Sequence, residues 1–172
     1  MVQSSLEKGS ALAVFGLRAG RLQAIARTPW IGTAHRWLNP AGIADYDGDG
    51  VPEVALVRTP HIGGTLQFWQ LHDGSMLTKG ELYGFSNHAI GSRIQNLSAT
   101  LDWNRDGLPD LMLPETGRQS IAIVSLRHGE VVVLTSIPMP DTVLGPMTTS
   151  EDGTSVTIPL AGGEEVTLSV PE

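Results

Sequence analysis

DYDGDGVPE, residues 45–53, recurs as DWNRDGLPD, residues 102–110. Both stretches place oxygen-bearing side chains at positions 1, 3, 5 and 9, a glycine at position 6 and a proline at position 8. A short apolar run follows each stretch, VALV in one case and LML in the other. Because the two copies share one pattern and one setting, they predict a fold built from a repeated unit.

Each loop crowds carboxylates together, and like charges held this close repel and raise one another's pKa. A hard divalent cation removes that repulsion, and oxygen ligands at alternate positions of a tight turn suit calcium. An EF-hand is one alternative, but it requires flanking helices and a glutamate at position 12, where these loops have Leu56 and Leu113. The other alternative is a pair of acidic turns without metal. The repetition of the whole pattern favours calcium over both alternatives.

Composition limits the class of protein. The 172 residues are 41% hydrophobic and 17% charged, which is typical of one globular domain with a substantial core. The net charge is −7, and the 11 basic residues are scattered, so nucleic acid is not an expected partner. The chain has no cysteine, which excludes disulfides and thiolate metal sites. No apolar stretch reaches the roughly 20 residues of a membrane-spanning helix, and the N-terminus does not have the pattern of a signal peptide.

Short apolar or alternating runs, separated by turn residues, predict an all-β chain. The turns Arg18-Ala19-Gly20, His72-Asp73-Gly74, Arg127-His128-Gly129 and Ala161-Gly162-Gly163 are typical of hairpins. The candidate strands cover residues 11–17, 21–27, 53–59, 65–71, 75–82, 110–114, 120–126, 130–137, 155–161 and 165–170.

These strands fall in the same order around each acidic loop. An approach strand (41–45 or 97–102) enters the loop, and three strands follow it. The match extends upstream, since Arg36 and Arg93 precede their loops by the same interval. Four antiparallel strands in roughly 40–60 residues is the size of a propeller blade. Within a single unit spanning 1–172, we predict a half blade over 11–28, blades over 36–82 and 93–137, and a degenerate blade over 143–170.

The degenerate blade contains a third loop that has lost its ligands. Asp152-Gly153 takes the place of Asp106-Gly107, whereas the ligand positions hold Thr148, Ser150 and Val156. We therefore predict no tight metal site in this third loop.

The loops and their strand–loop–strand setting resemble the FG-GAP/VCBS repeats of integrin-α-like β-propellers, over roughly residues 11–170. The FG and GAP dipeptides are not obvious, and closed members have more blades, which favours a bacterial-type repeat protein. The resemblance implies a partial β-propeller of about three four-stranded antiparallel blades with two structural Ca²⁺ ions. Its implied ligands are Asp45, Asp47, Asp49, Glu53 and the Val51 carbonyl for one ion, and Asp102, Asn104, Asp106, Asp110 and the Leu108 carbonyl for the other.

The two sites are expected to differ in affinity. The first loop offers four carboxylates, and the second offers three with one amide. Two unit charges about 4 Å apart repel by about 1 kcal/mol in water and about 4 kcal/mol at an effective dielectric of 20. The first loop therefore gains more from a cation, and we predict that it binds calcium more tightly.

His35, His61 and His88 lie near turn glycines. Together with Arg36 and Arg93 they form either a ligand-binding ring on one propeller face or ordinary turn and inter-blade hydrogen bonds, and we favour the second interpretation. The tryptophans could form a carbohydrate platform, but the alternating strand around Trp69 favours core packing. The four are Trp30, Trp37, Trp69 and Trp103.

We therefore expect a non-catalytic, calcium-binding repeat module that serves as a binding or scaffold domain of an exported protein. We expect that protein to be periplasmic, extracellular or at the cell surface, and this chain to be part of a longer propeller. The pattern does not identify a protein or carbohydrate ligand. One alternative is self-association that closes the propeller, because open blades leave exposed edges. The other is an enzyme with a His/Arg site on the inter-blade loops, although no nucleophile elbow or phosphate loop is present.

Overall fold

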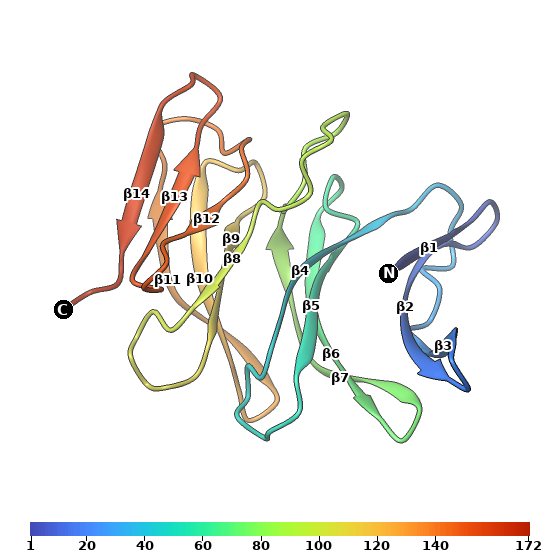
Figure 1. Ribbon diagram of the computed structural model, residues 1–172. Helices are drawn as coiled ribbons and strands as arrows, with labels where there is room; N and C mark the ends of the chain where they lie inside the picture. Colours follow the sequence, from blue (N-terminus) through green and yellow to red (C-terminus); the bar gives the residue numbers. More distant parts are fainter.

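The computed structural model describes residues 1–172 and contains strands, turns and loops without any helix (Figure 1). Fourteen strands form four antiparallel sheets, and each sheet is a meander of consecutive strands. No helix of a length and apolarity that would span a membrane is present. The prediction of an all-β chain is confirmed.

The four sheets follow one another along the chain. The first contains β1 (Val2–Ser5), β2 (Gly9–Arg18) and β3 (Arg21–Arg27). The second contains β4 (Leu38–Ala44), β5 (Glu53–Arg58), β6 (Gly64–His72) and β7 (Ser75–Phe85). The third contains β8 (Ala99–Leu101), β9 (Asp110–Pro114), β10 (Ser120–Arg127) and β11 (Glu130–Pro138). The fourth contains β12 (Thr148–Thr149), β13 (Ser155–Pro159) and β14 (Glu165–Ser169).

The first sheet has one strand more than the two expected over 11–28. β1 pairs with the start of β2 from Val2–Leu12 to Ser5–Gly9. Its sequence, VQSS, has one apolar residue and no alternating pattern, so neither propensity nor periodicity marks it as a strand. Tertiary packing stabilises this strand instead, because Val2 packs against the buried cluster that contains Leu12.

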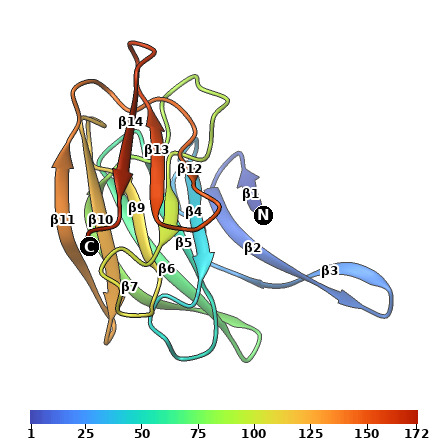
Figure 2. The ribbon, with the colours of Figure 1, turned by 60° about the vertical axis from the view of Figure 1, so that its left-hand side comes forward.

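Three of the expected hairpins are two-residue turns with both central residues at positive φ. The pairs are Ala19-Gly20, Asp73-Gly74 and His128-Gly129, and their φ values lie between 47° and 80°. That geometry is the one that matches the right-handed twist of the flanking strands. The β2–β3 hairpin projects away from the other sheets (Figure 2).

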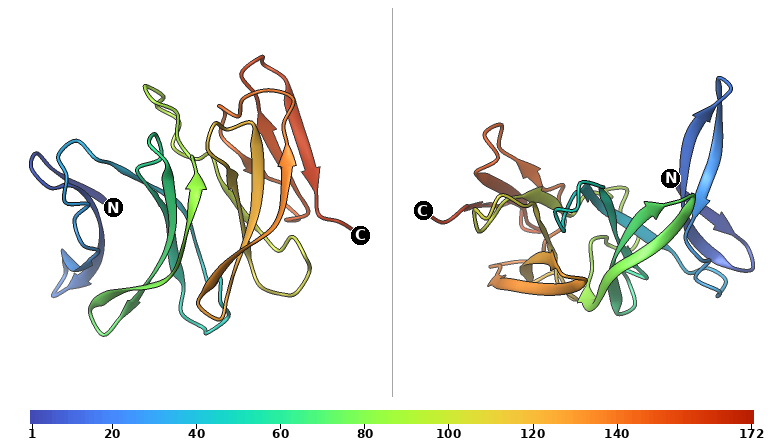
Figure 3. Two further views of the ribbon diagram at one scale, coloured as in Figure 1. Left: turned by 180° about the vertical axis from the view of Figure 1, so that it is seen from behind. Right: turned by 90° about the horizontal axis from the view of Figure 1, so that it is seen from below.

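Apolar residues from facing sheets form three buried clusters, one between each successive pair of sheets. Successive residues of β9 point to opposite sides, as strand geometry requires. Leu111 and Leu113 pack toward the second sheet with Phe68, whereas Met112 packs toward the fourth sheet with Ile158. The third cluster joins the first and second sheets. The sheets therefore stack face to face in sequence order (Figure 3).

The meander topology puts functionally different loops at opposite ends of this stack. The two acidic loops, 45–52 and 102–109, connect the first two strands of the second and third sheets and lie at the lower end in Figure 1. The β5–β6 turn (59–63), the β7–β8 linker (86–98) and the β9–β10 turn (115–119) lie at the other end.

Candidate metal sites

The two acidic loops share one hydrogen-bond frame. The position-1 carboxylate accepts the backbone N–H of the position-6 glycine, at 2.9 Å for Asp45–Gly50 and 2.9 Å for Asp102–Gly107. These glycines have φ of 87° and 86°, a conformation that glycine adopts without strain. The shared sequence pattern therefore gives both loops the same backbone conformation.

The position-9 carboxylate completes this frame. Glu53 Oε2 accepts the N–H of Tyr46 at 2.9 Å, and Asp110 Oδ2 accepts the N–H of Trp103 at 3.0 Å. Both acids are fully buried, and burial raises the pKa of each carboxyl group above its ordinary value. A buried carboxylate needs compensating partners, so these positions demand donors or a cation.

In the first loop, four carboxylates converge. Each of Asp45, Asp47, Asp49 and Glu53 places an oxygen within 4.8 Å of the others, and no other set of three or more acidic, histidine or cysteine side chains in the chain gathers this closely. Asp45 Oδ1 is buried without a hydrogen-bond partner. An orphaned, buried carboxylate oxygen in a ring of carboxylates fits a cation-binding site.

Two residues from neighbouring strands approach this ring. Gln70 on β6 directs Nε2 at four predicted ligand oxygens, at 2.8–3.1 Å from Asp49 Oδ1 and Oδ2, Val51 O and Glu53 Oε1. Rotating the amide by half a turn would present Oε1, which calcium accepts as a ligand.

Lys79 on β7 is the positively charged residue that pairs with the carboxylates of the first loop. Its Nζ lies 2.7 Å from Asp47 Oδ2 and 2.9 Å from Asp49 Oδ2. Hydrogen bonds from Gln70 and then Lys79 lower the pKa of Asp49 to about 2. The same two carboxylates raise the pKa of Lys79, so the lysine stays charged and partly offsets the loop's negative charge.

The second loop has a different counter-charge. Arg127 Nη2 donates to Asp106 Oδ2 at 2.7 Å and lies 3.5 Å from Asp110 Oδ1. The arginine lowers the pKa of Asp106. Asn104 Nδ2 also donates to Asp106 Oδ2, at 3.0 Å, so the amide turns a donor toward its neighbour. Ser125 Oγ donates to Asp110 Oδ1.

The two loops touch each other. Arg127 Nη1 donates to the backbone carbonyl of Tyr46 at 2.8 Å, which links the second loop's counter-charge to the first loop. A Cβ atom added at Gly48 would come within 2.8 Å of Leu108 Cδ2, so the leucine side chain of the second loop lies directly against this glycine. The loops therefore form one continuous acidic end of the molecule.

Sequence reasoning missed four residues that act on these loops: Gln70, Lys79, Ser125 and Arg127. Two of them had a usable signal in the strand register. Gln70 pairs directly with Glu53 across β5 and β6, and Ser125 follows the Leu111–Val124 pair. Lys79 and Arg127 reach the loops through long side chains from strand positions that no local pattern marks.

The third loop, in which we predicted no tight metal site, has a different set of contacts from the other two loops. Asp152 is its central acid, and it accepts hydrogen bonds from Ser150 Oγ at 2.6 Å and Thr154 Oγ1 at 2.8 Å. Hydroxyl donors here satisfy a single carboxylate, so the turn is closed by protein groups alone.

The histidines and arginines expected to form a ring come together only in part. His61 Nε2 and His88 Nδ1 are 2.6 Å apart, and a cavity of about 40 Å³ is lined by His61 together with His35 and Arg36. Arg93 is exposed and lies outside that cavity. A space of this size holds little more than a water molecule, and His35 and Arg36 also line a separate cavity of about 290 Å³ beside the β1–β2 turn.

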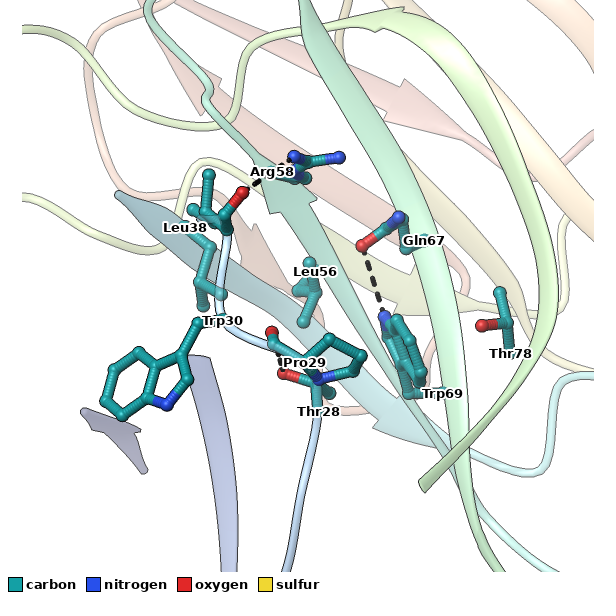
Figure 4. Close-up of a pocket in the computed structure, with 10 residues that line it drawn as sticks. Thr28, Pro29, Trp30, Leu38, Leu56, Arg58, Gln67, Trp69 and Thr78 are labelled. Atoms are coloured by element: carbon teal, nitrogen blue, oxygen red, sulfur yellow. Dashed lines mark hydrogen bonds between the residues drawn. The ribbon is translucent and has the colours of Figure 1, made fainter. Parts of the chain in front are cut away.

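Trp69 packs in the core between the first two sheets, as the alternation of its strand predicts. Its exposed fraction is 9%, and its Nε1 donates to Gln67 Oε1 at 3.2 Å. Figure 4 shows these two side chains and Trp30 around a cleft of about 200 Å³ between the second sheet and the 28–31 segment. Arg58 closes one side of the cleft by donating to Ile31 O at 3.3 Å.

Neither protein-family models nor curated proteins match this chain. The resemblance to FG-GAP/VCBS repeats therefore stays a prediction, and the loop geometry is the basis for a functional proposal.

Proposed function

We propose that this chain is a calcium-stabilised segment of a β-propeller that acts as a non-catalytic binding or scaffold module of an exported protein. Four meander sheets that pack face to face in sequence order support the propeller part of the proposal. Blades of four antiparallel strands are the unit of that architecture. Extracellular calcium, which suits sites of modest affinity, supports the exported location.

The observation that carries the calcium proposal is the ring of four carboxylates in the first loop. The side chains of Asp45, Asp47, Asp49 and Glu53 and the carbonyl of Val51 would hold the ion. The buried, unpartnered Asp45 Oδ1 would gain a ligand role, and Gln70 would contribute its amide oxygen after rotation. Calcium supplies the positive charge that this ring lacks, because Lys79 is the only cation that contacts it.

The second loop is the weaker site in this proposal. Asp102, Asp106 and Asp110 with the Asn104 amide and the Leu108 carbonyl would hold the ion. Calcium there competes with Arg127, whose guanidinium group already pairs with Asp106. Competition with a resident cation lowers the apparent affinity of a site.

Thermal unfolding with and without chelator tests the proposal. An ion that binds only the folded state adds about 2.7 kcal/mol of stability at a hundredfold excess over its dissociation constant. For a domain of this size, that shift raises the melting temperature by roughly 5–10 °C. We expect calcium to raise the midpoint and magnesium to raise it much less. A midpoint that is the same in calcium and in chelator would remove the structural-calcium proposal.

Self-association is a second candidate, favoured by the projecting β2–β3 hairpin. Leu17 and Leu22 pair across this hairpin and are 76% and 64% exposed. Exposed apolar side chains on an edge strand favour contact with another chain. Mass measurement in solution tests this candidate: a monodisperse dimer that Leu22→Asp dissociates supports it, and a wild-type monomer at high concentration removes it.

A further inference from the structure

The end of the molecule opposite the acidic loops carries a concentration of basic groups. Three segments that meet there, 28–37, 59–63 and 86–98, contain two arginines and three histidines and no acidic residue. This is unusual for a chain with a net charge of −7. Gathered positive charges raise the local concentration of anionic ligands, so these three segments suit an anion.

Side-chain contacts join these segments into one cluster. Trp37 stacks on His61 with ring centroids 6.0 Å apart and meets His88 edge-on at 4.7 Å. Arg118, from the β9–β10 turn, donates from Nη1 to Ser86 Oγ at 3.4 Å. Ser86 in turn lies 3.5 Å from the carbonyl of His88. Four loops thus converge on a half-buried guanidinium group.

Arg118 has no carboxylate partner. Its Nε is buried and makes no hydrogen bond, and its only side-chain hydrogen bond is the long one to Ser86. The acid of the same turn, Glu115, is held instead by the hydroxyl groups of Ser120 and Ser136. A half-buried, unpaired charge is costly, and an external anion would remove that cost.

The hydrogen-bond pattern fixes the protonation of the neighbouring histidines. The Ser92 carbonyl can only accept, so His88 Nε2 carries a proton and donates to it at 3.2 Å. His88 Nδ1 then accepts from His61 Nε2, which leaves His61 Nδ1 as the one site where the pair can take up a proton. Burial and the positive charge of Arg118 lower the pKa of both histidines. The lowered pKa favours the neutral form of the pair while Arg118 is unpaired.

We propose that Arg118, with Ser86 and the His61–His88 pair, forms a binding site for a small oxyanion, either a tetrahedral phosphate-like group or a carboxylate. The guanidinium group supplies charge and paired donors, the geometry with which arginine recognises oxyanions. An anion beside Arg118 also offsets the arginine charge, which, after burial, contributes to lowering the pKa of both histidines. Anion binding should thus raise the pKa of the histidine pair and add a proton at His61. The other ionisable groups facing His61 are Arg36 and His35.

The experiment follows the imidazole proton signals of His61 and His88 by NMR in the full chain. Sulfate is the tetrahedral probe, acetate is the carboxylate probe, and sodium chloride at equal ionic strength is the control. We expect one of the two oxyanions to move both histidine signals saturably and to raise their pKa, and chloride to leave both unchanged. The stronger of the two probes identifies the chemical class of the ligand.

Arg118→Gln should weaken this binding about tenfold or more, the loss expected for a charge-assisted hydrogen bond. Arg93→Gln, which removes an exposed charge at the same end, is the matched control and should bind as wild type. If Arg118→Gln does not fold, Arg118→Lys keeps the charge but not the paired donors and should still bind less tightly. Equal shifts in wild type and in the Arg118 variants, or no saturable shift with either probe, would overturn the proposal. Neither result depends on calcium binding at the opposite end.

Discussion

The loops 45–53 and 102–110 have the same pattern and the same backbone hydrogen bonds, yet they form different sites. In the first loop, four carboxylates converge within 4.8 Å around an unpartnered Asp45 oxygen. In the second, an arginine has already paired with Asp106. The difference comes from the strands that face each loop, which supply Gln70 and Lys79 to one and Ser125 and Arg127 to the other. A loop motif therefore fixes a backbone, and its neighbours decide how strongly that backbone needs a cation.

The position-2 aromatic residue gives the largest expected difference between the loops. Tyr46 is fully buried, packs edge-on against Phe68 at 5.0 Å and contacts the Thr100 hydroxyl at 2.9 Å. Trp103 is only partly buried. Truncating a buried aromatic residue costs about 3–5 kcal/mol, so Tyr46→Ala should lower the free energy of unfolding by that amount. Trp103→Ala should cost clearly less, about 1–2 kcal/mol.

Urea unfolding of both variants in chelator measures this difference without any contribution from calcium. The Tyr46 hydroxyl is tested separately by Tyr46→Phe, which keeps the ring and should cost only about 1 kcal/mol. Equal losses of unfolding free energy for Tyr46→Ala and Trp103→Ala would show that the two aromatic residues stabilise their loops equally. That result would contradict the proposed difference between the loops.

Removing the position-1 carboxylate compares the two loops as calcium sites. Asp45→Ala takes an oxygen from the carboxylate ring, whereas Asp102→Ala takes one from a loop in which Arg127 already competes. We expect Asp45→Ala to abolish the tighter of two calorimetric binding events and most of the calcium-dependent rise in melting temperature, up to the roughly 2.7 kcal/mol available at a hundredfold excess of calcium. Asp102→Ala should abolish only the weaker event. Reversed losses would contradict the order of affinities.

Lys79 tests how a positive charge already present at the first loop affects its calcium affinity. Its Nζ contacts two carboxylates of the first loop, so it opposes an incoming cation. A unit positive charge about 4 Å from a divalent ion repels it by about 2 kcal/mol in water, so Lys79→Met should bind calcium roughly thirtyfold more tightly. Lys8→Met, at an exposed turn away from the loop, is the control and should not change the affinity. An unchanged affinity for Lys79→Met would mean that the lysine leaves the ring at no cost when calcium binds.

Most strands and turns of this fold could be predicted from the sequence, and β1 could not. Period-two alternation and the turns at Ala19-Gly20, Asp73-Gly74 and His128-Gly129 were sufficient to predict the meanders, because strand patterning and turn geometry are local properties. Pairing along the chain then placed each acidic loop between two strands. β1 was not predicted, because it is a strand through its pairing with β2 rather than through its own composition.

For the candidate sites, the sequence predicted the ligands within each loop but not the residues that approach the loops from other strands. The ligand positions of each loop are read from spacing, since all of them lie within nine consecutive residues. The counter-charges come from distant positions, as with Arg127, which reaches Tyr46 across 81 residues of sequence. Such contacts depend on which sheets pack against each other and on the direction that a long side chain takes, and a single sequence carries no pattern for either.

The smallest expected effect is a pH dependence that separates Glu53 from Asp110. Burial raises the pKa of both carboxyl groups, so each binds more protons in the folded than in the unfolded protein. In chelator, the free energy of unfolding should therefore fall as the pH rises from the ordinary carboxyl pKa near 4 through the higher folded value. Glu53→Gln should flatten this fall. Asp110→Asn should flatten it less, because Arg127, 3.5 Å away, already stabilises the ionised form of Asp110.

Calcium should reverse the direction of this trend at the first loop. The ion binds the ionised form of Glu53, so its stabilisation grows as the pH rises and Glu53 loses its proton. The difference in melting temperature between calcium and chelator should consequently widen with pH in wild type and vary less in Glu53→Gln. The measured quantity is the slope of this melting-temperature difference against pH, rather than the absolute stability. The slope is used because the Glu53→Gln substitution also disturbs the hydrogen bonds to Tyr46 and Gln70. A wild-type difference that is independent of pH would mean that Glu53 is not a calcium ligand, and the first loop would lose the deepest of its four carboxylates.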